Sequence, residues 1–557
     1  MTSESNYTTL ATALERLKAD ASLSKIKRAE LASAIQRVCS FLGKAPEDVP
    51  VAPKHLRYIL SRLHPVQAGV NARSLANVKS GLASALRQTG LLPPALVPRP
   101  RSVAWVEFLA AAPAAYHAVH LTRFVTYCGV RRIEPHQVSD KTISEYQAHL
   151  DSRLIGKEPF ALCRETVQTW NCIARAHGPA VSELTPLRSG RYICPPLSTY
   201  PSSLQVEFQG YLDRLAHKDI FLEDGPDKPL KPVTIRNIEA ALRQYLSALL
   251  DAGQKADQLT SLSQIITADM IKVGAKAIHA RLSPTRTPTA LHGIVSALLA
   301  IARHHLHLPD AEIGRIQRIK KQTAVSQSGM TAKNRERLGQ FDDWLNVSRL
   351  LNLPKILLEQ CGDRPNLRSN PQKALIAAAI CILTSCPIRV KNLASLDLDR
   401  HVSSSGTGKH RSYTIRIDAT EVKNQNHIEV RLSGPNSRLL HEYIVHWRHQ
   451  LSPVPGSALF PRVSDGGPRR SDQIGHLVCD TIYRETGLRV NVHLFRHIAA
   501  YLYLNERPGD FESVRRFLGH RRLATTMTFY ADLSSKWAHE HYDKVVLSKF
   551  TGGRDDD

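Results

Sequence analysis

Four side chains that can carry acid–base or nucleophilic chemistry lie in one stretch near the end of the sequence. The stretch NVHLFRHIAAYLYLNERPGDFESVRRFLGHRRLATTMTFYADL, residues 491–533, contains His493, Arg496, His520 and Tyr530. Histidine transfers protons near neutral pH, arginine donates paired hydrogen bonds to phosphate oxygens, and tyrosine can act as a nucleophile. No carboxylate pair and no metal-ligand spacing accompanies them. The set therefore favours chemistry on a phosphodiester in which the protein itself supplies the positive charge.

Two more basic residues extend this set. The apolar run ALIAAAICILTSC, residues 374–386, predicts a buried helix that leads into PIRVKNL and places Arg389 at the end of a rigid element. Lys423 lies in or beside a turn between two β-like segments. Taken singly, each of these residues has an ordinary alternative as a solvated surface side chain. Together they describe two arginines that stabilise a five-coordinate phosphorus and a lysine that protonates the departing oxygen.

Local patterns predict the elements that hold these side chains. His493 and Arg496 are three residues apart, so a helix would place them on one face. Gly519 stands where a helix stops and puts His520 just beyond its end. The segments SYTIRIDA and HIEVRLS, joined by TEVKNQN, predict an antiparallel pair of strands.

The charge balance of the whole chain indicates a polyanionic partner. The 557 residues include 74 Lys and Arg against 50 Asp and Glu, a formal charge of +24. Such an excess attracts nucleic acid first and anionic membrane second, but no basic amphipathic helix with an aromatic face stands out. The polar first residues predict no signal peptide, the longest apolar run is too short to span a bilayer, and nine cysteines form no C-x-x-C pair. We expect a cytoplasmic protein associated with the nucleoid.

Proline-rich breaks and repeated helical patterns predict the domain organisation. Three similar segments each open with an amphipathic helix ending near a glycine, continue through a polar loop into a short helix, and close with a longer helix. The alternative is that any small helical bundles look this similar. We predict a mainly α fold in which these units precede an α+β domain with a small antiparallel sheet. The expected division is 1–95, 103–195 and 202–312 for the helical units, 313–338 for a basic linker, 339–548 for the α+β domain and 549–557 for a disordered tail.

The region from about Phe341 to Val546 resembles the catalytic domain of the tyrosine recombinases, the phage integrase family. The matching residues are Arg389 in TSCPIRVKNLASLDL, Lys423 in the hairpin, His493 and Arg496 in HLFRH, His520 in LGH, and Tyr530 in TTMTFYADL. The sequence departs from the family in having Pro387 where glycine is frequent and in a histidine-to-tyrosine interval that is one residue longer.

The resemblance implies a role for each residue. These roles are a clamp on the phosphate for Arg389 and Arg496, protonation of the leaving 5′-oxygen for Lys423, proton transfer and hydrogen bonding for His493 and His520, and nucleophilic attack for Tyr530. The implied enzyme is a site-specific DNA recombinase, an integrase or transposase of a mobile element. It would cut and rejoin strands through a covalent 3′-phosphotyrosyl intermediate, with no metal and no cofactor.

The resemblance also implies partners. They are double-stranded DNA and further copies of the chain in a tetramer on DNA, with partner recombinases or DNA-bending proteins as further candidates and no membrane. The helical units resemble the family's SAM-like core-binding domain, and residues 202–312 correspond to it. Since one such unit is usual, we expect the two extra units to add phosphate contacts beside the core site.

Three other functions compete with recombination. A type IB topoisomerase-like nicking-closing enzyme uses a similar set of residues and would relax supercoils as a lone monomer. A non-catalytic DNA-binding protein with the same fold would have no need of the tyrosine nucleophile. A basic helical scaffold would match six ordered positions only by chance.

Overall fold

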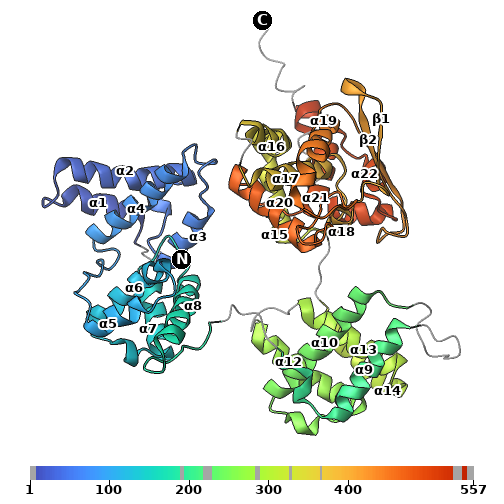
Figure 1. Ribbon diagram of the computed structural model, residues 1–557, viewed down its shortest axis with the longest axis horizontal. Coiled ribbons are helices and arrows are strands. Elements are labelled where there is room, and N and C mark those ends of the chain that lie inside the picture. Colours follow the sequence, from blue (N-terminus) through green and yellow to red (C-terminus); the bar gives the residue numbers. More distant parts are fainter. Residues whose placement is uncertain are drawn as a thin grey trace, which may run out of the picture. The chain divides into compact units, whose positions relative to one another are not determined.

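The computed structural model describes residues 8–187, 194–217, 229–282, 289–324, 329–363, 367–530 and 542–547. The predicted tail 549–557 lies outside these residues. The chain divides into two compact units, one formed by Met1–Arg188 with Gly329–Asp557 and the other by Ser189–Ser328. Figure 1 shows the helical units in blue, teal and green and the C-terminal domain in yellow to red.

The three N-terminal segments each form a small helical unit. The first contains α1 (Leu10–Ala19), α2 (Lys25–Leu42), α3 (Pro53–Arg62) and α4 (Ala72–Gln88). The second contains α5 (Val103–Ala110), α6 (Ala115–Arg131), α7 (Asp140–Asp151) and α8 (Pro159–His177). The third contains α9 (Ser202–Ala216), α10 (Pro232–Asp251), α11 (Leu262–Ile265), α12 (Ala268–Leu282), α13 (Thr289–His304) and α14 (Asp310–Gln322).

The units share a local plan that reflects the repeated sequence pattern. In each unit a single 3₁₀ turn follows the second helix, at Pro46–Asp48, Pro135–Gln137 and Ala256–Gln258. The structure adds to the predicted pattern one helix before the first predicted helix of each unit. In the closing helix α8, buried Cys163 and Trp170 lie two turns apart on one face, as an amphipathic helix requires.

The prediction of a basic linker over residues 313–338 is wrong at both ends, because one helix extends into it to Gln322 and another begins at Ala332 and buries Leu338 in the C-terminal core. Helix α14 continues to Gln322 and buries Ile313, Ile316 and Ile319 in the core of the third unit. Three isoleucines at three-residue spacing form a narrow apolar stripe, and the many basic and polar residues between them made the segment resemble a solvated linker. The third unit therefore extends beyond residue 312.

The C-terminal domain is built around one apolar helix. It contains α15 (Ala332–Gly339), α16 (Trp344–Asp363), α17 (Asn370–Ser385), α18 (Val390–Ala394), α19 (Gly434–Glu442), α20 (Ser471–Thr486), α21 (Leu494–Glu506), α22 (Phe511–Leu518) and a helical segment at 523–530. Every residue of α17 from Ala374 to Leu383 is buried, which confirms the buried helix predicted from its apolar run. Helices α16, α19, α20 and α21 contact it.

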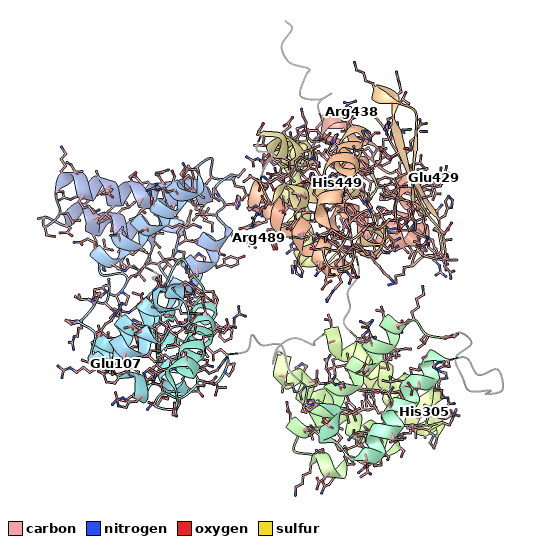
Figure 2. The ribbon with its side chains drawn as sticks, in the orientation of Figure 1. Glu107, His305, Glu429, Arg438, His449 and Arg489 are labelled. Atoms are coloured by element: carbon pink, nitrogen blue, oxygen red, sulfur yellow. The ribbon has the colours of Figure 1, made fainter. Side chains whose placement is uncertain are left out.

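A three-stranded antiparallel sheet interrupts the helices of this domain. Its strands β1 (Val402–Ser405), β2 (Ser412–Ile417) and β3 (Ile428–Leu432) pair in sequence order. Strand β1 was not predicted, because its run of serines has little strand propensity. Arg416 of β2 faces Glu429 of β3, and its Nη2 lies 3.1 Å from Oε1 of Glu429. Figure 2 labels Glu429. The turn between β2 and β3 carries Lys423.

In the described part of the chain, none of the helices has both the length and the apolar character needed to cross a bilayer.

The place of α14 in the third core leads to a test. Ile316 is fully buried, so Ile316→Ala should destabilise this unit by about 2–5 kcal/mol, since the substitution leaves a cavity. Hydrogen exchange of the full chain, followed by mass spectrometry, should show faster exchange in peptides from α12 and α13, which contact α14. Gln317→Ala, a change at an exposed position of the same helix, is the control. Equal exchange in both variants would contradict the packing of α14.

Candidate active site

Arg389 lies directly after the central apolar helix. Helix α17 ends at Ser385, and the backbone N–H of Cys386 closes its last turn with a bond of 2.7 Å to the Ile382 carbonyl. Pro387 then prevents the helix from continuing. The half-buried Arg389 donates from Nη2 to Oδ1 of Asn424 at 3.0 Å. Burial lowers the pKa of its guanidinium.

Arg496 is the most deeply buried cation of the site. It lies on α21, and its side chain reaches across to two other segments. Nη1 donates to the Pro387 carbonyl at 2.8 Å, and Nη2 donates to the Leu518 carbonyl. Burial, and then the nearby charge of Arg389, lower its pKa to about 10. One guanidinium therefore holds together the Arg389 loop, α21 and the end of α22.

The two predicted histidines lie at helix ends. His493 occupies the N-cap position directly before α21, and its carbonyl accepts from the backbone N–H of Arg496 at 3.2 Å. His520 follows Gly519, which ends α22 in the left-handed conformation with φ of 63°, as the sequence predicted. The Nδ1 atom of His520 lies 3.0 Å from the hydroxyl of Thr526.

Both histidines are held neutral. Burial, and then the positive charges of Arg496 and Arg389, lower the pKa of His520 to about 4. The same causes lower the pKa of His493. Near neutral pH each ring can therefore accept one hydrogen bond and donate another.

Tyr530 ends the helical segment 523–530 and is only 1% exposed. Its hydroxyl lies 3.0 Å from Nδ1 of His497 and 3.5 Å from the Arg496 carbonyl. Burial raises the pKa of the phenol. Burial, followed by the charges of His493 and Arg496, lowers the pKa of His497 to about 4, so its ring is neutral and can accept the tyrosine proton in a hydrogen bond.

The structure does not join Lys423 to this cluster by a contact. Its side chain is exposed in the turn between β2 and β3, and no hydrogen bond or ion pair links it to another described residue. The next residue, Asn424, bridges the cluster instead. Its Nδ2 donates to the Gly519 carbonyl at 2.9 Å, while its Oδ1 accepts from Arg389.

Three residues of the site were missed in the sequence. Asn424 stands in a polar turn typical of any hairpin, and His497 was part of the quoted HLFRH motif but received no role. Arg521 donates from Nε to the Asn424 carbonyl at 2.8 Å and from Nη2 to Gln425 at 2.6 Å. A basic residue directly after LGH was the only signal for Arg521.

A cavity of about 240 Å³ opens beside the two arginines. Its lining includes Arg389, Arg496 and Arg516, and the only carboxylate is that of Glu429, which is already paired with Arg416. Such a surplus of guanidinium groups suits an oxyanion. Within the described residues there is no group of three or more His, Cys, Asp or Glu side chains that could hold a metal ion.

Comparisons with known proteins address the C-terminal domain most directly. The phage integrase family matches residues 355–536. No curated protein matches the sequence. This family segment contains all the site residues described above.

Several solved structures resemble the fold. The XerH site-specific recombinase bound to difH substrate aligns with 55% of this chain and 80% of its own, at 18% identity and a TM-score of 0.35. The Tn1549 transposon integrase in complex with a circular intermediate DNA aligns with 60% and 98%, at 14% identity and a TM-score of 0.35. The XerA recombinase aligns with 61% and 98%, at 17% identity and a TM-score of 0.24. At these values the likeness says nothing about function by itself.

The family match and the geometry concern the same segment. Within it, Arg389 after α17, His493 and Arg496 of α21, His520 after α22 and Tyr530 of the segment 523–530 form one cluster. Residues 355–536 are therefore a domain of the phage integrase family, the tyrosine recombinases, and the cluster lies within it.

Proposed function

We propose that the protein is the site-specific recombinase of a mobile element, an integrase or transposase, which cuts and rejoins duplex DNA through a 3′-phosphotyrosyl intermediate. The observation that supports this proposal is the convergence of two guanidinium groups, two neutral histidines and a buried tyrosine in one cluster. A binding protein would have no use for a tyrosine beside two phosphate-binding arginines.

The arginines act on the phosphate. The hydrogen bonds described above engage two of the five N–H groups that a guanidinium offers at Arg496 and one at Arg389. In our proposal the other N–H groups bind the non-bridging oxygens. Because these oxygens gain negative charge as phosphorus becomes five-coordinate, fixed and partly desolvated cations stabilise the transition state more than the ground state.

Tyr530 is the nucleophile in this proposal. Its oxygen attacks phosphorus, a bond from the tyrosine oxygen to phosphorus forms, and the bond from phosphorus to the 5′-oxygen breaks. The hydroxyl must first leave His497, since that bond holds it in the buried position. The phenolic proton passes to a neutral histidine of the cluster, with His520 and His493 the available rings.

Lys423 protonates the departing 5′-oxygen in this proposal. Its exposed place in the β2–β3 turn, next to the Asn424 bridge, allows its flexible side chain to approach bound DNA. Religation reverses the steps, with the 5′-hydroxyl of a partner strand attacking the phosphotyrosine. The phosphotyrosyl bond keeps the energy of the broken bond, so no external energy source is needed.

The proposal includes an assembly. Strand exchange requires two duplexes and four cuts, and we propose a tetramer of the chain on DNA, with accessory or partner recombinases where the element needs them. We place it with the DNA of the cytoplasm. Residues 202–324, the third helical unit, would be the core-binding domain.

The nucleophile is tested by changing one atom. Tyr530→Phe should bind DNA as the wild type does but form no covalent adduct, because only the attacking oxygen is lost. The assay is gel separation of protein–DNA adducts formed with DNA from the ends of the element. Tyr542→Phe, an exposed tyrosine, is the matched control and should form the adduct. An adduct that maps to another tyrosine would show that the assignment is wrong.

The division of labour between Lys423 and Arg389 has a separate test. Lys423→Ala should cleave ordinary DNA poorly and recover on DNA whose bridging 5′-oxygen is sulfur, a leaving group that needs no proton. Arg389→Ala should stay impaired on both substrates, because its charge is required whichever atom leaves. The measurement is the single-turnover cleavage rate on each substrate. Equal recovery of both variants, or of neither, would contradict these roles.

The neutral histidines predict how stability depends on pH. An unfolded histidine has a pKa of about 6.5, whereas that of folded His520 is about 4, so protons favour the unfolded chain as pH falls from 7 toward 4. After allowance for partial exposure, His520 should account for about 1 kcal/mol of stability lost between pH 7 and 5. His520→Gln should therefore show a smaller loss in urea titrations of the domain's fluorescence at the two pH values. Equal losses would contradict the lowered pKa.

A further inference from the structure

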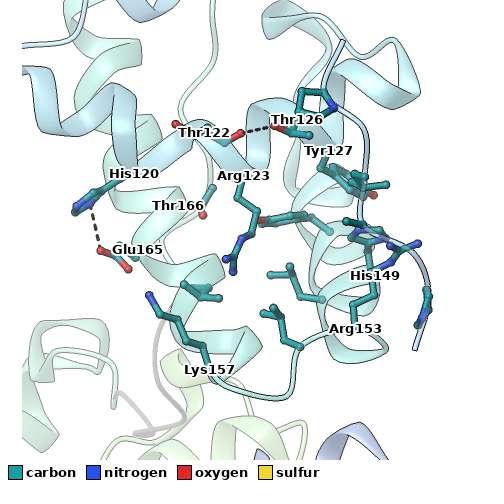
Figure 3. Close-up of a pocket in the computed structure, with 18 of the residues that line it drawn as sticks. His120, Thr122, Arg123, Thr126, Tyr127, His149, Arg153, Lys157, Glu165 and Thr166 are labelled. Carbon is teal, nitrogen blue, oxygen red and sulfur yellow. Dashed lines mark hydrogen bonds and ion pairs between the residues drawn. The ribbon is translucent and has the colours of Figure 1, made fainter. Parts of the chain in front are cut away.

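A second positively charged cavity lies far from the catalytic residues in the sequence. It has a volume of about 620 Å³, is open to solvent, and is lined by α6, α7, the start of α8 and the segment 93–98 (Figure 3). Basic residues from four different parts of the chain line it. They are Arg87 at the end of α4, Arg123 on α6, Arg153 after α7 and Lys157 before α8.

The charge in this cavity is not balanced locally. Its lining contains one carboxylate, that of Glu165, and this group is paired with His120 at 3.2 Å. The second unit as a whole is not basic, because residues 103–187 contain eight Lys or Arg and eight Asp or Glu. Positive charge has therefore gathered in the cavity rather than being spread over the unit.

Some of the lining is fixed and some is free to reach a ligand. Arg153 is half-buried and donates from Nη1 to the Pro94 carbonyl, which holds it against the segment 93–98. Arg123 and Lys157 are exposed, and Figure 3 shows both side chains directed into the same space. No hydrogen bond or ion pair joins either of them to another described residue.

The titration behaviour of the wall agrees with an excess of positive charge. Burial, and then the charges of Arg153 and Arg131, lower the pKa of His149 to about 4. Burial, and then Arg131 and Arg87, lower the pKa of Arg153. The charged forms of His149 and Arg153 are thus disfavoured by burial and by neighbouring positive charge, and an anion bound beside them would offset the second effect.

We propose that this cavity binds the sugar–phosphate backbone of duplex DNA outside the segment that is cut. Exposed Arg and Lys side chains around an open space suit successive phosphates of a polyanion, which they neutralise with release of counterions. The inference rests on the proposed function for the identity of the partner, but it gives the second helical unit a binding task of its own. It replaces the general expectation of phosphate contacts from the extra units with a defined site.

The test compares two double charge reversals in the full chain. Arg123→Glu with Lys157→Glu alters the cavity, and Lys141→Glu with Arg164→Glu makes the same change of net charge at exposed positions outside its lining. Binding is measured on a duplex longer than the core site at several salt concentrations. If each side chain contacts one phosphate, the cavity variant should lower the slope of log K against log[salt] by about 1.8. The control should leave the slope close to that of the wild type.

Hydrogen exchange locates the contact. The same duplex should slow exchange in peptides covering 119–127 and 150–158 of the wild type, and this protection should disappear in the cavity variant. Equal slopes for the two double variants, or no protection by the duplex, would overturn the proposal. Protection by inorganic phosphate or ATP without protection by the duplex would also overturn it, in favour of a small phosphorylated ligand.

A substitute variant and the choice of a binding readout keep the result interpretable. If the charge reversals disturb folding, Arg123→Gln with Lys157→Gln replaces them and should lower the slope in the same direction. All readouts are of binding, so a chain that binds through this cavity but never cleaves DNA would contradict the proposed function and leave this proposal standing.

Discussion

The catalytic domain depends on the hydrogen bonds of one buried guanidinium. Arg496 is 6% exposed, and its bonds to the Pro387 and Leu518 carbonyls connect three segments that are distant in the sequence. Loss of this side chain would leave two buried carbonyls unsatisfied, at about 1–3 kcal/mol each. The same bonds set where the neighbouring Arg389 and His520 lie. Stability and the proposed phosphate binding therefore depend on one side chain, so a substitution at Arg496 should affect both.

The electrostatic state of the site follows from this burial. Arg389, His493 and His520 all have lowered pKa values, first because of burial and, for the histidines, because of the two guanidinium groups. The cluster thus combines two positively charged guanidinium groups with imidazole rings that would be positive if protonated. Burial reduces the screening of these charges by water. In the proposed reaction an incoming phosphodiester brings the missing negative charge. The scarcity of carboxylates in the lining of the neighbouring cavity fits this proposal.

The sequence predicted the order of the six residues and the elements that carry them, because helix ends, a glycine stop and an apolar run are local signals. It could not predict Asn424 or the bond between His497 and Tyr530, since both depend on segments that meet only after folding. The linker prediction failed for α14 because three buried isoleucines are outnumbered by polar neighbours. Lys423 stays a prediction, because its side chain is exposed and no hydrogen bond or ion pair joins it to the cluster of described residues.

The hydrogen bond between Tyr530 and His497 adds a free-energy cost to the release of the tyrosine hydroxyl. In the proposed reaction only molecules in which the hydroxyl has been released can attack. If release costs about 1.4 kcal/mol, about one molecule in ten is competent and cleavage slows about tenfold. A partner that favours the released state, whether DNA or a second copy of the chain, would recover that factor. Nicking of DNA by a solitary molecule would then be limited by the small population in which the hydroxyl is released. The assembled complex would lose none of its cleavage rate.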